Sequence, residues 1–429
     1  MIVTDVDVVL KRKDVCYIKV KNARHALGEL SSVFYNNPAD SLAVYGITGT
    51  NGKTTTAYLM RHIFSSVGKP TGIITTVEYG IGDRSIPASR TTPEAPLLQS
   101  LLSQILLSQC VNAVMEVSSH ALVQERVAGI DFDGAIFTNL TRDHLDYHKT
   151  RENYILAKKL LFSNIGRGRK QSFAVINIDD PVAPVMISAV EDRARVITYG
   201  TMGKGDVCAE NTTLSERGSF FCIKTPWGNA EVKTKLLGRF NIYNILAALS
   251  ACVASGVPID KAVSSISTAS PAPGRLQEIE NNRNIKIFVD YAHTDDALEN
   301  VLRTLREITK GRLIVVFGCG GNRDVTKRPA MGKIATEIAD HTIVTSDNPR
   351  KEDPLKIIED IKAGISPSSS FEIEPDRREA IKKAISIAKE NDVIIVAGKG
   401  HETFQELANK TIYFDDRLVI DELLKNEKL

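Results

Sequence analysis

The sequence lacks the features of a secreted or membrane-spanning protein. Its six cysteines are scattered from Cys16 to Cys319 without a Cys-x-x-Cys pair, which argues against a disulfide framework and a zinc site. No apolar run reaches the about eighteen residues of a transmembrane helix. Acidic residues, Asp5 and Asp7, stand where a signal peptide carries its basic segment. We therefore expect reduced thiols, no membrane insertion and a cytoplasmic location.

The chain also lacks a strong charge of either sign. Its 54 lysines and arginines nearly balance its 52 aspartates and glutamates, for a formal net charge of +2. This balance gives no broad attraction to nucleic acid, which is therefore not an expected partner. There is no short-period repeat, and 429 residues are too many for one ordinary core, so we expect two or three domains.

Strands alternate with helices over most of the chain, which predicts an α/β fold with mostly parallel sheets. The proline-rich segment 270–274 indicates a linker between one domain at 41–270 and a second doubly wound domain at 271–429. Residues 1–40 offer only one strand and one helix, too little to bury a core alone. Residues 206–235 have short strands and little helix, and we expect an antiparallel strand insertion there.

A glycine-rich turn lies between an apolar strand at 42–45 and a helix at 55–67. Its residues are Gly49, Thr50, Asn51, Gly52, Lys53, Thr54 and Thr55. Glycines let backbone N–H groups point inward around a phosphate, and the following helix N-terminus adds its positive dipole. Lys53 can reach the β- and γ-phosphates, and the Thr54 hydroxyl can bind Mg²⁺. Ile47 stands where an ordinary P-loop has its first glycine, and a turn that binds nothing is the alternative. Gly-Lys-Thr between strand and helix nevertheless predicts a nucleoside triphosphate site.

Further polar residues follow the next apolar runs. Glu116 ends one of them, where a carboxylate can hold Mg²⁺ beside Lys53 and Thr54. A helix-capping acid is the alternative. Segment 138–148 follows another run and holds two histidines, among them His144, together with two aspartates. In a chain with a nucleotide site, this cluster favours metal or phosphate chemistry over a structural role.

Charged loops follow the strands of the second domain and are expected at one sheet edge. They carry Arg323, Asp347, Asn348, Arg350 and Glu402. Guanidinium groups take carboxylates through paired hydrogen bonds, and the acids can take an ammonium. The loops therefore predict a site for a zwitterion, with arginines in surface salt bridges as the alternative.

Taken together, these motifs resemble the Mur ligase family. The segments that carry the resemblance are 49–54, 116–120, 139–148, 157–158, 238–244, 274–275, 290–294, 318–324, 347–350 and 398–402. The resemblance implies a central ATP-binding domain at 41–270 and a C-terminal Rossmann-like domain for amino-acid binding at 271–429. Residues 1–40 would be the remnant of an N-terminal UDP-binding domain, and we expect apolar side chains without cover on it.

The family uses ATP to join a carboxylate to an amine through an acyl phosphate, with release of ADP. The resemblance implies two Mg²⁺ ions, one held by Thr54 and Glu116 and one by His144 and Lys158. Lys158, which composition alone would make a solvated helix lysine, would carry CO₂ as a carbamate. The implied catalytic residues are Lys53, Glu116, His144 and Lys158. Further implied contacts are to ATP from Asn241, Asn244, Arg275 and Asp290, and to the muramyl peptide from Thr91, Thr92, Ser119 and Arg126.

The resemblance is strongest to members that add the third amino acid of the peptidoglycan stem peptide. In the family, Asp-Asn-Pro-Arg, here 347–350, goes with meso-diaminopimelate, because the arginine takes the second carboxylate that lysine lacks. The implied diaminopimelate site is Arg323, Asp347, Asn348, Arg350, Gly398 and Glu402. We therefore predict a monomeric ligase that adds meso-diaminopimelate to UDP-N-acetylmuramoyl-L-alanyl-D-glutamate. This reaction supplies the cell-wall precursor on which cell shape and division depend.

Two other functions compete with this interpretation. A folylpolyglutamate synthase would share the central domain, but Arg350 and Glu116 in their motifs argue against it. A catalytically dead nucleotide-binding scaffold would not need Lys53, His144 and Lys158 together. One departure from the family is Asp295, which stands where proline is usual and is expected to alter only a turn.

Overall fold

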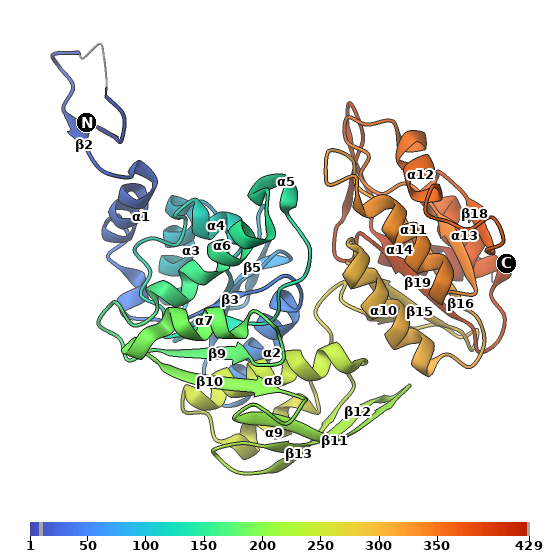
Figure 1. Cartoon of the computed structure of the whole chain (residues 1–429), viewed down its shortest axis with the longest axis horizontal. Helices are drawn as coiled ribbons and strands as arrows, with labels where there is room; N and C mark the ends of the chain where they lie inside the picture. The colour runs from blue at the N-terminus through green and yellow to red at the C-terminus, as the bar shows by residue number, and fades with distance from the viewer. Residues whose placement is uncertain (8–11, 427–429) are drawn as a thin grey trace.

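The computed structural model describes residues 1–7 and 12–426. An eleven-stranded sheet organises the central part of the chain (Figure 1). Side by side, its strands are β13 (Ala230–Thr234), β12 (Gly218–Lys224), β11 (Val207–Ser215), β10 (Arg195–Gly200), β9 (Phe173–Asn177), β8 (Gly134–Phe137), β3 (Ala43–Thr48), β7 (Asn112–Glu116), β4 (Thr71–Ile74), β5 (Glu78–Ile81) and β6 (Arg84–Pro87). Neighbouring strands are parallel from β11 to β4 and antiparallel at both ends, which confirms the mostly parallel α/β fold.

Helices cover both faces of this sheet. One face packs on α2 (Lys53–Ser66), α8 (Arg239–Ala254) and α9 (Ile259–Ile266). The other packs on α3 (Ala95–Leu107), α4 (Ser119–Val123), α6 (Arg151–Asn164) and α7 (Ala183–Val190). Along β3, Tyr45 and Ile47 enter the first core and Val44 the second, because successive side chains of a strand point to opposite faces. The carboxyl ends of β3, β7 and β8 therefore meet at one edge.

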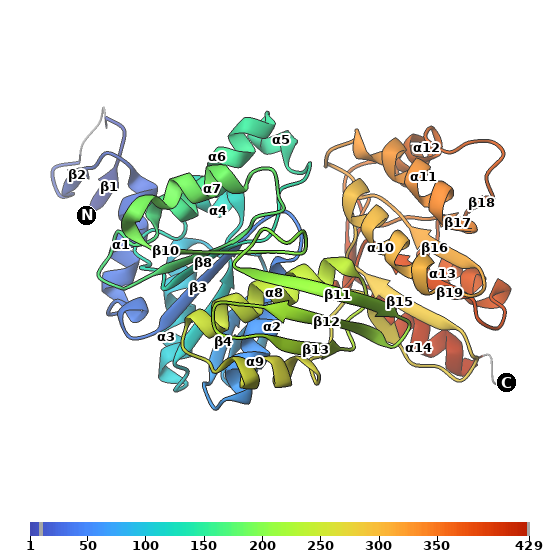
Figure 2. The ribbon, with the colours of Figure 1, turned by 60° about the horizontal axis from the view of Figure 1, so that its bottom comes forward.

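The antiparallel strands predicted at 206–235 are present as β11, β12 and β13. They extend the main sheet, since β11 also pairs in parallel with β10. The tip of the β11–β12 hairpin reaches the C-terminal domain (Figure 2), where Lys310 forms an ion pair of 3.2 Å with Glu216. The hairpin thus contacts the C-terminal domain at a place away from the phosphate loop.

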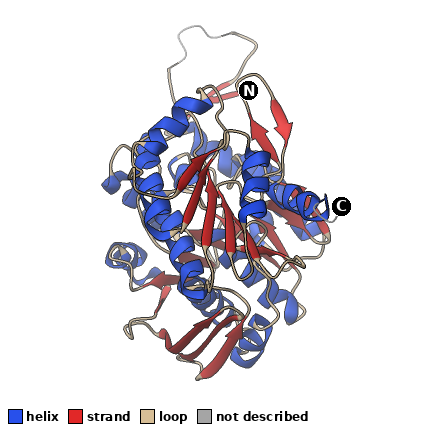
Figure 3. Ribbon diagram, turned by 90° about the vertical axis from the view of Figure 1, so that its right-hand side faces the viewer, coloured by secondary structure: helices blue, strands red, loops and turns tan. Residues whose placement is uncertain are grey.

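The C-terminal domain is a second α/β unit around a six-stranded sheet, which Figure 3 shows with helices on both sides. Its strands lie in the order β14 (Gln277–Ile279), β15 (Lys286–Asp290), β19 (Val393–Ala397), β16 (Leu313–Phe317), β17 (His341–Val344) and β18 (Phe371–Ile373), all parallel except β14. One face packs on α10 (Asp295–Ile308), α11 (Lys327–Ile338) and α12 (Pro354–Lys362). The other packs on α13 (Arg377–Ile387) and α14 (Asp416–Asn426). A small hairpin of β20 (Phe404–Glu406) and β21 (Thr411–Tyr413) follows β19.

Within residues 1–7 and 12–40 there are two short strands rather than the one that we expected. Strand β1 (Ile2–Thr4) pairs in parallel with β2 (Tyr17–Lys19), and α1 (Ala23–Phe34) follows. Helix α1 packs closely against the central domain at Gly28, where a Cβ would lie 2.6 Å from the side chain of Ala128. Its other side bears the exposed apolar residues Leu27, Leu30, Val33 and Phe34, which agrees with the uncovered surface predicted there.

The remaining short elements complete the chain. They are η1 (Pro38–Asp40), α5 (Leu145–His148) and η2 (Glu191–Arg193). No helix in residues 1–7 and 12–426 is long and apolar enough to cross a membrane.

Candidate active site between the two large domains

A cavity of about 460 Å³ lies between the central and C-terminal domains. Both domains contribute predicted site residues to its wall. These are Thr50, Asn51, Gly52, Lys53, Thr54, Thr55, Thr91, Glu116, His144, Asn241 and Asn244 from the central domain, and Arg275 and Asp290 from the C-terminal part. The structure therefore brings the predicted phosphate loop and the predicted metal ligands to one place.

The phosphate loop follows β3, and two of its glycines have positive φ angles. Gly49 has φ +151° and lies against Thr138, whose hydroxyl would be 1.9 Å from a Cβ at this position. Gly52 has φ +86° and lies against Asn244 of α8, with 2.3 Å to its side-chain oxygen. Any larger residue would collide at both positions, so the sequence needs glycine there for the loop to fit.

Lys53 begins α2 and turns back into the loop. Its Nζ donates hydrogen bonds to the carbonyl oxygens of Gly49 (3.0 Å) and Thr50 (2.7 Å). Burial lowers the pKa of Lys53, and the negative charges of Glu116 and Asp143 oppose that shift. The ammonium is thus held at the phosphate loop, close to acidic groups that a metal ion would screen.

Glu116 ends β7 and is 1% exposed. Its Oε1 accepts hydrogen bonds from the Thr54 hydroxyl (2.8 Å) and the Thr76 backbone N–H (3.0 Å), and its Oε2 accepts one from the Thr76 hydroxyl (3.2 Å). A buried carboxylate beside a hydroxyl at a phosphate loop is the oxygen-donor arrangement that Mg²⁺ prefers. This pair fits the predicted metal ligands better than the alternative of a helix-capping acid, because neither oxygen of Glu116 caps a helix.

His144 and Lys158 lie around one tyrosine ring. Lys158 on α6 is 1% exposed, its Nζ lies 4.5 Å from the centre of the Tyr154 ring, and it donates to the carbonyl oxygen of Gly49 at 2.7 Å. The ring of His144 lies 6.0 Å from that of Tyr154. Burial, with Lys53 nearby, lowers the pKa of Lys158 well below its usual range. Lys158 is therefore a buried lysine at the phosphate loop, and the solvated helix lysine that composition alone suggests is wrong.

The surroundings of His144 favour its neutral form. Burial lowers its pKa to about 4, against the opposing charge of Asp143, whose carboxylate lies 3.4 Å from Nε2. A neutral imidazole is the form that binds a metal ion. Within residues 1–7 and 12–426, no three His, Cys, Asp or Glu side chains converge as a metal site. The predicted sites instead combine Glu116 and His144 with a hydroxyl and a lysine.

The residues on α8 and β15 that are predicted to contact ATP have different roles in the cavity wall. Asn244 donates to the side-chain oxygen of Asn241 at 3.0 Å, which holds both amides at the wall of the cavity. Asp290 is almost fully buried and accepts from the backbone N–H groups of Leu276 (2.5 Å) and Ala292 (2.7 Å). Both of its oxygens therefore fix the backbone beside Arg275, so Asp290 shapes the cavity wall as well as lining it.

Direct contacts join the two domains across the cavity. The phosphate-loop residue Asn51 donates to Asp296 of α10 at 2.7 Å, and Thr141 donates to the same carboxylate at 3.2 Å. His401 makes a hydrogen bond of 3.2 Å with the carbonyl oxygen of Thr76, the residue that also contacts Glu116. The 398–402 loop of the C-terminal domain thus contacts Thr76, which hydrogen-bonds to the predicted metal ligand Glu116.

Three of the four residues predicted to hold the muramyl peptide are linked through Glu116 and Thr76. Thr92 donates to the carbonyl oxygen of Glu116 (2.8 Å), and Arg126 donates to the carbonyl oxygen of Thr92 (2.8 Å). Thr91 accepts from the Thr76 hydroxyl at 3.1 Å. Ser119 is buried and hydrogen-bonds at 2.9 Å to His148, the second histidine of the cluster at 138–148.

Asp347, Asn348, Arg350, Gly398 and Glu402, predicted for the zwitterion, follow the carboxyl ends of β17 and β19, whereas Arg323 follows β16. Asn348 donates to Oε2 of Glu402 at 2.8 Å, and Gly398 (φ +113°) would place a Cβ 2.6 Å from Oδ2 of Asp347. That oxygen is buried and has no hydrogen-bond partner among the described residues, so it can accept from an ammonium. Arg323 is exposed and donates only to its neighbour Asn322 at 3.3 Å within the described chain.

One important member of this site was missed in the sequence. Lys399 is fully buried, and its Nζ donates to Asn348 (3.1 Å) and to Oε2 of Glu402 (3.1 Å). It thereby compensates the buried charge of Glu402, whose pKa burial raises. Its place between Gly398 and Gly400, inside a loop already assigned to the site, was the signal that could have identified it.

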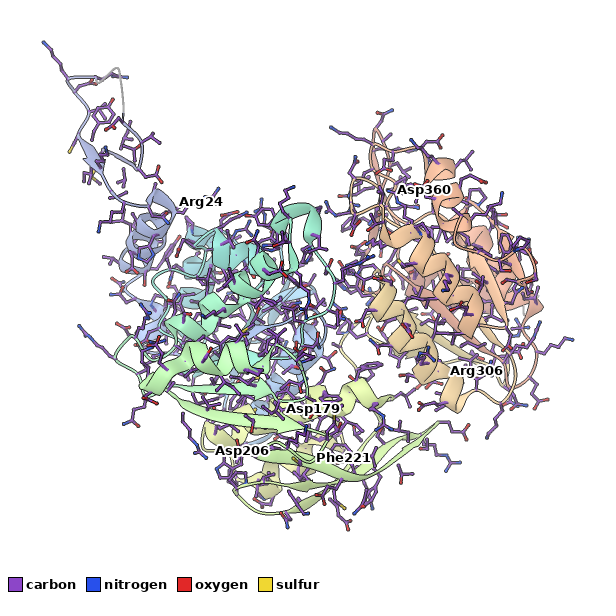
Figure 4. The ribbon with its side chains drawn as sticks, in the orientation of Figure 1. Arg24, Asp179, Asp206, Phe221, Arg306 and Asp360 are labelled. Carbon is purple, nitrogen blue, oxygen red and sulfur yellow. The ribbon has the colours of Figure 1, made fainter. Side chains whose placement is uncertain are left out.

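Ion pairs of a buried arginine hold the elements next to these loops. Arg328 of α11 is 1% exposed and pairs with Asp360 of α12 (2.8 Å) and with Glu352 (2.9 Å). Figure 4 marks Asp360 on α12 in the C-terminal domain, and Asp179 on the central domain. Asp179 accepts from the hydroxyl of Tyr243 at 2.9 Å, which fixes α8 at the cavity rim. Ion pairs and hydrogen bonds therefore hold the elements around the site in both domains.

Comparison with known proteins agrees with this geometry. The Mur ligase middle domain matches residues 47–252, and the domain described as "Mur ligase, glutamate ligase domain" matches residues 274–400. A UDP-N-acetylmuramoyl-L-alanyl-D-glutamate–2,6-diaminopimelate ligase of Geobacillus kaustophilus is 48% identical over 410 residues, 95% of this chain and 83% of that protein. A protein with the same description from Clostridium acetobutylicum, numbered 1 there, is 46% identical over 95% of this chain and 83% of its own length.

Solved structures show the same relationship. A structure described as UDP-N-acetylmuramoyl-L-alanyl-D-glutamate–2,6-diaminopimelate ligase matches with a TM-score of 0.71 and 35% identity, over 100% of this chain and 87% of the other. Folylpolyglutamate synthase of Mycobacterium tuberculosis matches with a TM-score of 0.74 but only 17% identity, over 88% of this chain and 93% of the other. The second match shows a shared fold alone.

Proposed function

The chain belongs to the Mur ligase family, and from that premise we propose that it adds meso-diaminopimelate to UDP-N-acetylmuramoyl-L-alanyl-D-glutamate with ATP. The main support for the proposal is that Lys53, Thr54 and Glu116 line the same cavity as Arg275 of the other domain. A ligase of this kind must bring ATP and an acceptor carboxylate together at one point. The diaminopimelate in the name of the relatives agrees with the Asp-Asn-Pro-Arg loop at 347–350.

In the proposed reaction the substrate carboxylate attacks the γ-phosphorus of ATP, and ADP leaves with the electrons of the broken P–O bond. The amine of diaminopimelate then attacks the acyl carbon, phosphate leaves, and the amine loses a proton. Lys53 and the N–H groups around Gly52 would hold the phosphates and offset their growing charge. Thr91, Thr92, Ser119 and Arg126 would position the muramyl peptide beside Glu116.

Thr54 and Glu116 would hold one Mg²⁺, and His144 with Lys158 would hold the other; when bound, the ions would screen the phosphate charges. Lys158 fits a CO₂ carbamate, because its lowered pKa favours the neutral amine that can add CO₂. The carbamate would turn a buried cation into an oxygen ligand, the kind that Mg²⁺ takes. Without it, two amine groups, Lys53 and Lys158, would share the carbonyl oxygen of Gly49.

The remaining expectations belong to the same proposal. The chain would act as a monomer, and it would work in the cytoplasm, where its nucleotide substrates are. The test of the function is mass spectrometry of the product formed from ATP, Mg²⁺, the UDP-muramyl dipeptide and meso-diaminopimelate. A UDP-muramyl tripeptide is expected, and ADP formation without this product would contradict the proposal.

A further inference from the structure

Glu406, the last residue of β20, is tied to the Asp347–Arg350 loop at three points. Its backbone N–H donates to the side-chain oxygen of Asn348 at 3.0 Å, and its carbonyl oxygen accepts from the backbone N–H of Arg350 at 3.0 Å. Its carboxylate forms an ion pair of 2.6 Å with Nε of Arg350. Two of these contacts use the backbone, so a change of the Glu406 side chain leaves them in place.

Arg350 is held in an unusual conformation. Its φ is +54°, which a residue with a Cβ rarely adopts. Its Nη1 donates to the carbonyl oxygen of Gly321 at 2.9 Å, and a Cβ on Gly320 would lie 2.9 Å from that same nitrogen. The glycines of the 318–324 loop therefore let the guanidinium approach the loop closely.

The two contacts leave a defined part of the guanidinium for a ligand. Glu406 lies against the Nε side, with its Oε2 buried, and Gly321 takes one N–H of Nη1. Among the described residues, Nη2 makes no hydrogen bond. A carboxylate can therefore bind across Nη1 and Nη2, since a guanidinium offers donors along two edges in one plane.

We propose that Glu406 is a specificity-determining residue, which positions the Arg350 guanidinium for the second carboxylate of the amino-acid substrate. This inference rests on the proposed function for the identity of that substrate. The ion pair also keeps Arg350 from rotating toward solvent, where its side chain is already 25% exposed. Restricting a long side chain before binding lowers the entropy cost of binding.

The alternative role of Glu406 is competition. Its carboxylate would then occupy Arg350 and be displaced by the substrate, and its removal would strengthen binding. The geometry favours positioning, because Glu406 approaches from the Nε side and leaves the Nη1–Nη2 edge accessible.

Isothermal titration calorimetry on the full chain in the presence of ADP and Mg²⁺ tests the inference with meso-diaminopimelate and L-lysine as probes. In Glu406→Ala, the Kd for meso-diaminopimelate should rise about fivefold, the effect of losing a partly exposed ion pair. The Kd for L-lysine should stay unchanged, because lysine has no second carboxylate. Glu406→Gln should recover little of the affinity, because the contact of Oε2 with Nε is an ion pair without a hydrogen bond and an amide carries no charge.

Glu422→Ala is the matched control, because Glu422 pairs with Arg378 at 2.8 Å on the outside of the same domain. It should leave both Kd values unchanged. An unchanged or lower Kd for meso-diaminopimelate in Glu406→Ala would overturn the inference, and so would an equal loss for both probes. Because binding is measured directly, a chain that binds in the expected pattern but forms no tripeptide would contradict only the proposed function. A chain that binds no meso-diaminopimelate would contradict both.

Discussion

Arg275 and Thr54 lie 221 positions apart in the sequence, yet Nη2 of Arg275 donates to the Thr54 hydroxyl at 3.1 Å. The same guanidinium lies 4.5 Å above the ring of Tyr291. A residue just after the interdomain linker is thus fixed by stacking in one domain and touches a predicted metal ligand in the other. Closure of the two domains over ATP would bring its charge to the phosphates.

This contact predicts a strong effect of Arg275→Ala on turnover. We expect kcat/KM for ATP to fall about 30- to 1,000-fold, since a charge-assisted contact to a phosphate is lost at a largely buried site. Arg275→Lys should restore little, because an ammonium cannot stack on Tyr291 and reach Thr54 at once. Steady-state kinetics with varied ATP measures both. Arg303→Ala, on the exposed side of α10, is the control, and an equal loss there would contradict the assignment.

Lys158→Ala is expected to abolish product formation while leaving ATP binding in place. The variant loses the proposed carbamate ligand, and Lys53 keeps its own contacts at the phosphate loop. Activity should return in part when formate or acetate is added, because a small carboxylate can take the position of the carbamate. Phosphate release with and without formate measures this. Full activity in Lys158→Ala would rule out a role in the reaction, and Lys159→Ala is the neighbouring control.

Arg350→Ala should cut the use of meso-diaminopimelate at least about tenfold in kcat/KM, because the second carboxylate loses its charged partner. The KM for ATP should change little, since Arg350 does not line the cavity around the phosphate loop. Kinetics at saturating UDP-muramyl dipeptide separates the two. An unchanged kcat/KM for meso-diaminopimelate in Arg350→Ala would contradict the proposal that Arg350 binds the second carboxylate.

The stability of the protein should fall in mild acid, in part because of His148. Burial lowers the pKa of His148 to about 4 from 6.5, with His120 and Lys158 as further causes. Because the folded pKa lies below the unfolded one, protonation favours unfolding. The contribution of neutral His148 to the free energy of unfolding is therefore complete above pH 6.5. It is lost as the pH falls from 6.5 toward 4, because the unfolded chain takes up the proton first.

Urea unfolding at several pH values between 7.5 and 4.5 checks this prediction. His148→Asn should be less stable at neutral pH, through loss of the contact to Ser119, but its free energy of unfolding should fall less steeply with acid. His25→Asn, at an exposed position of α1, should keep the slope of the unaltered chain. Parallel slopes for the unaltered chain and His148→Asn would contradict the assignment.

Much of this site could be predicted from short stretches of sequence. Lys53, Thr54 and Glu116 stand at strand ends in a parallel sheet, and strand ends of such a sheet meet at one edge. Contacts between distant segments could not be predicted in this way. Asn51 with Asp296, or Glu406 with Arg350, depends on how two domains or two loops pack, and no local pattern records that. Lys158 and Lys399 show the same limit, because their full burial follows only from the surrounding packing.

The most direct test of the central claim is phosphate release from ATP by the purified chain with Mg²⁺ and UDP-N-acetylmuramoyl-L-alanyl-D-glutamate. The assay is run in parallel with meso-diaminopimelate, with L-lysine and with neither. Our account predicts release that depends on meso-diaminopimelate and stays at background with L-lysine. Release that depends on L-lysine, or that proceeds equally without any amino acid, would contradict it.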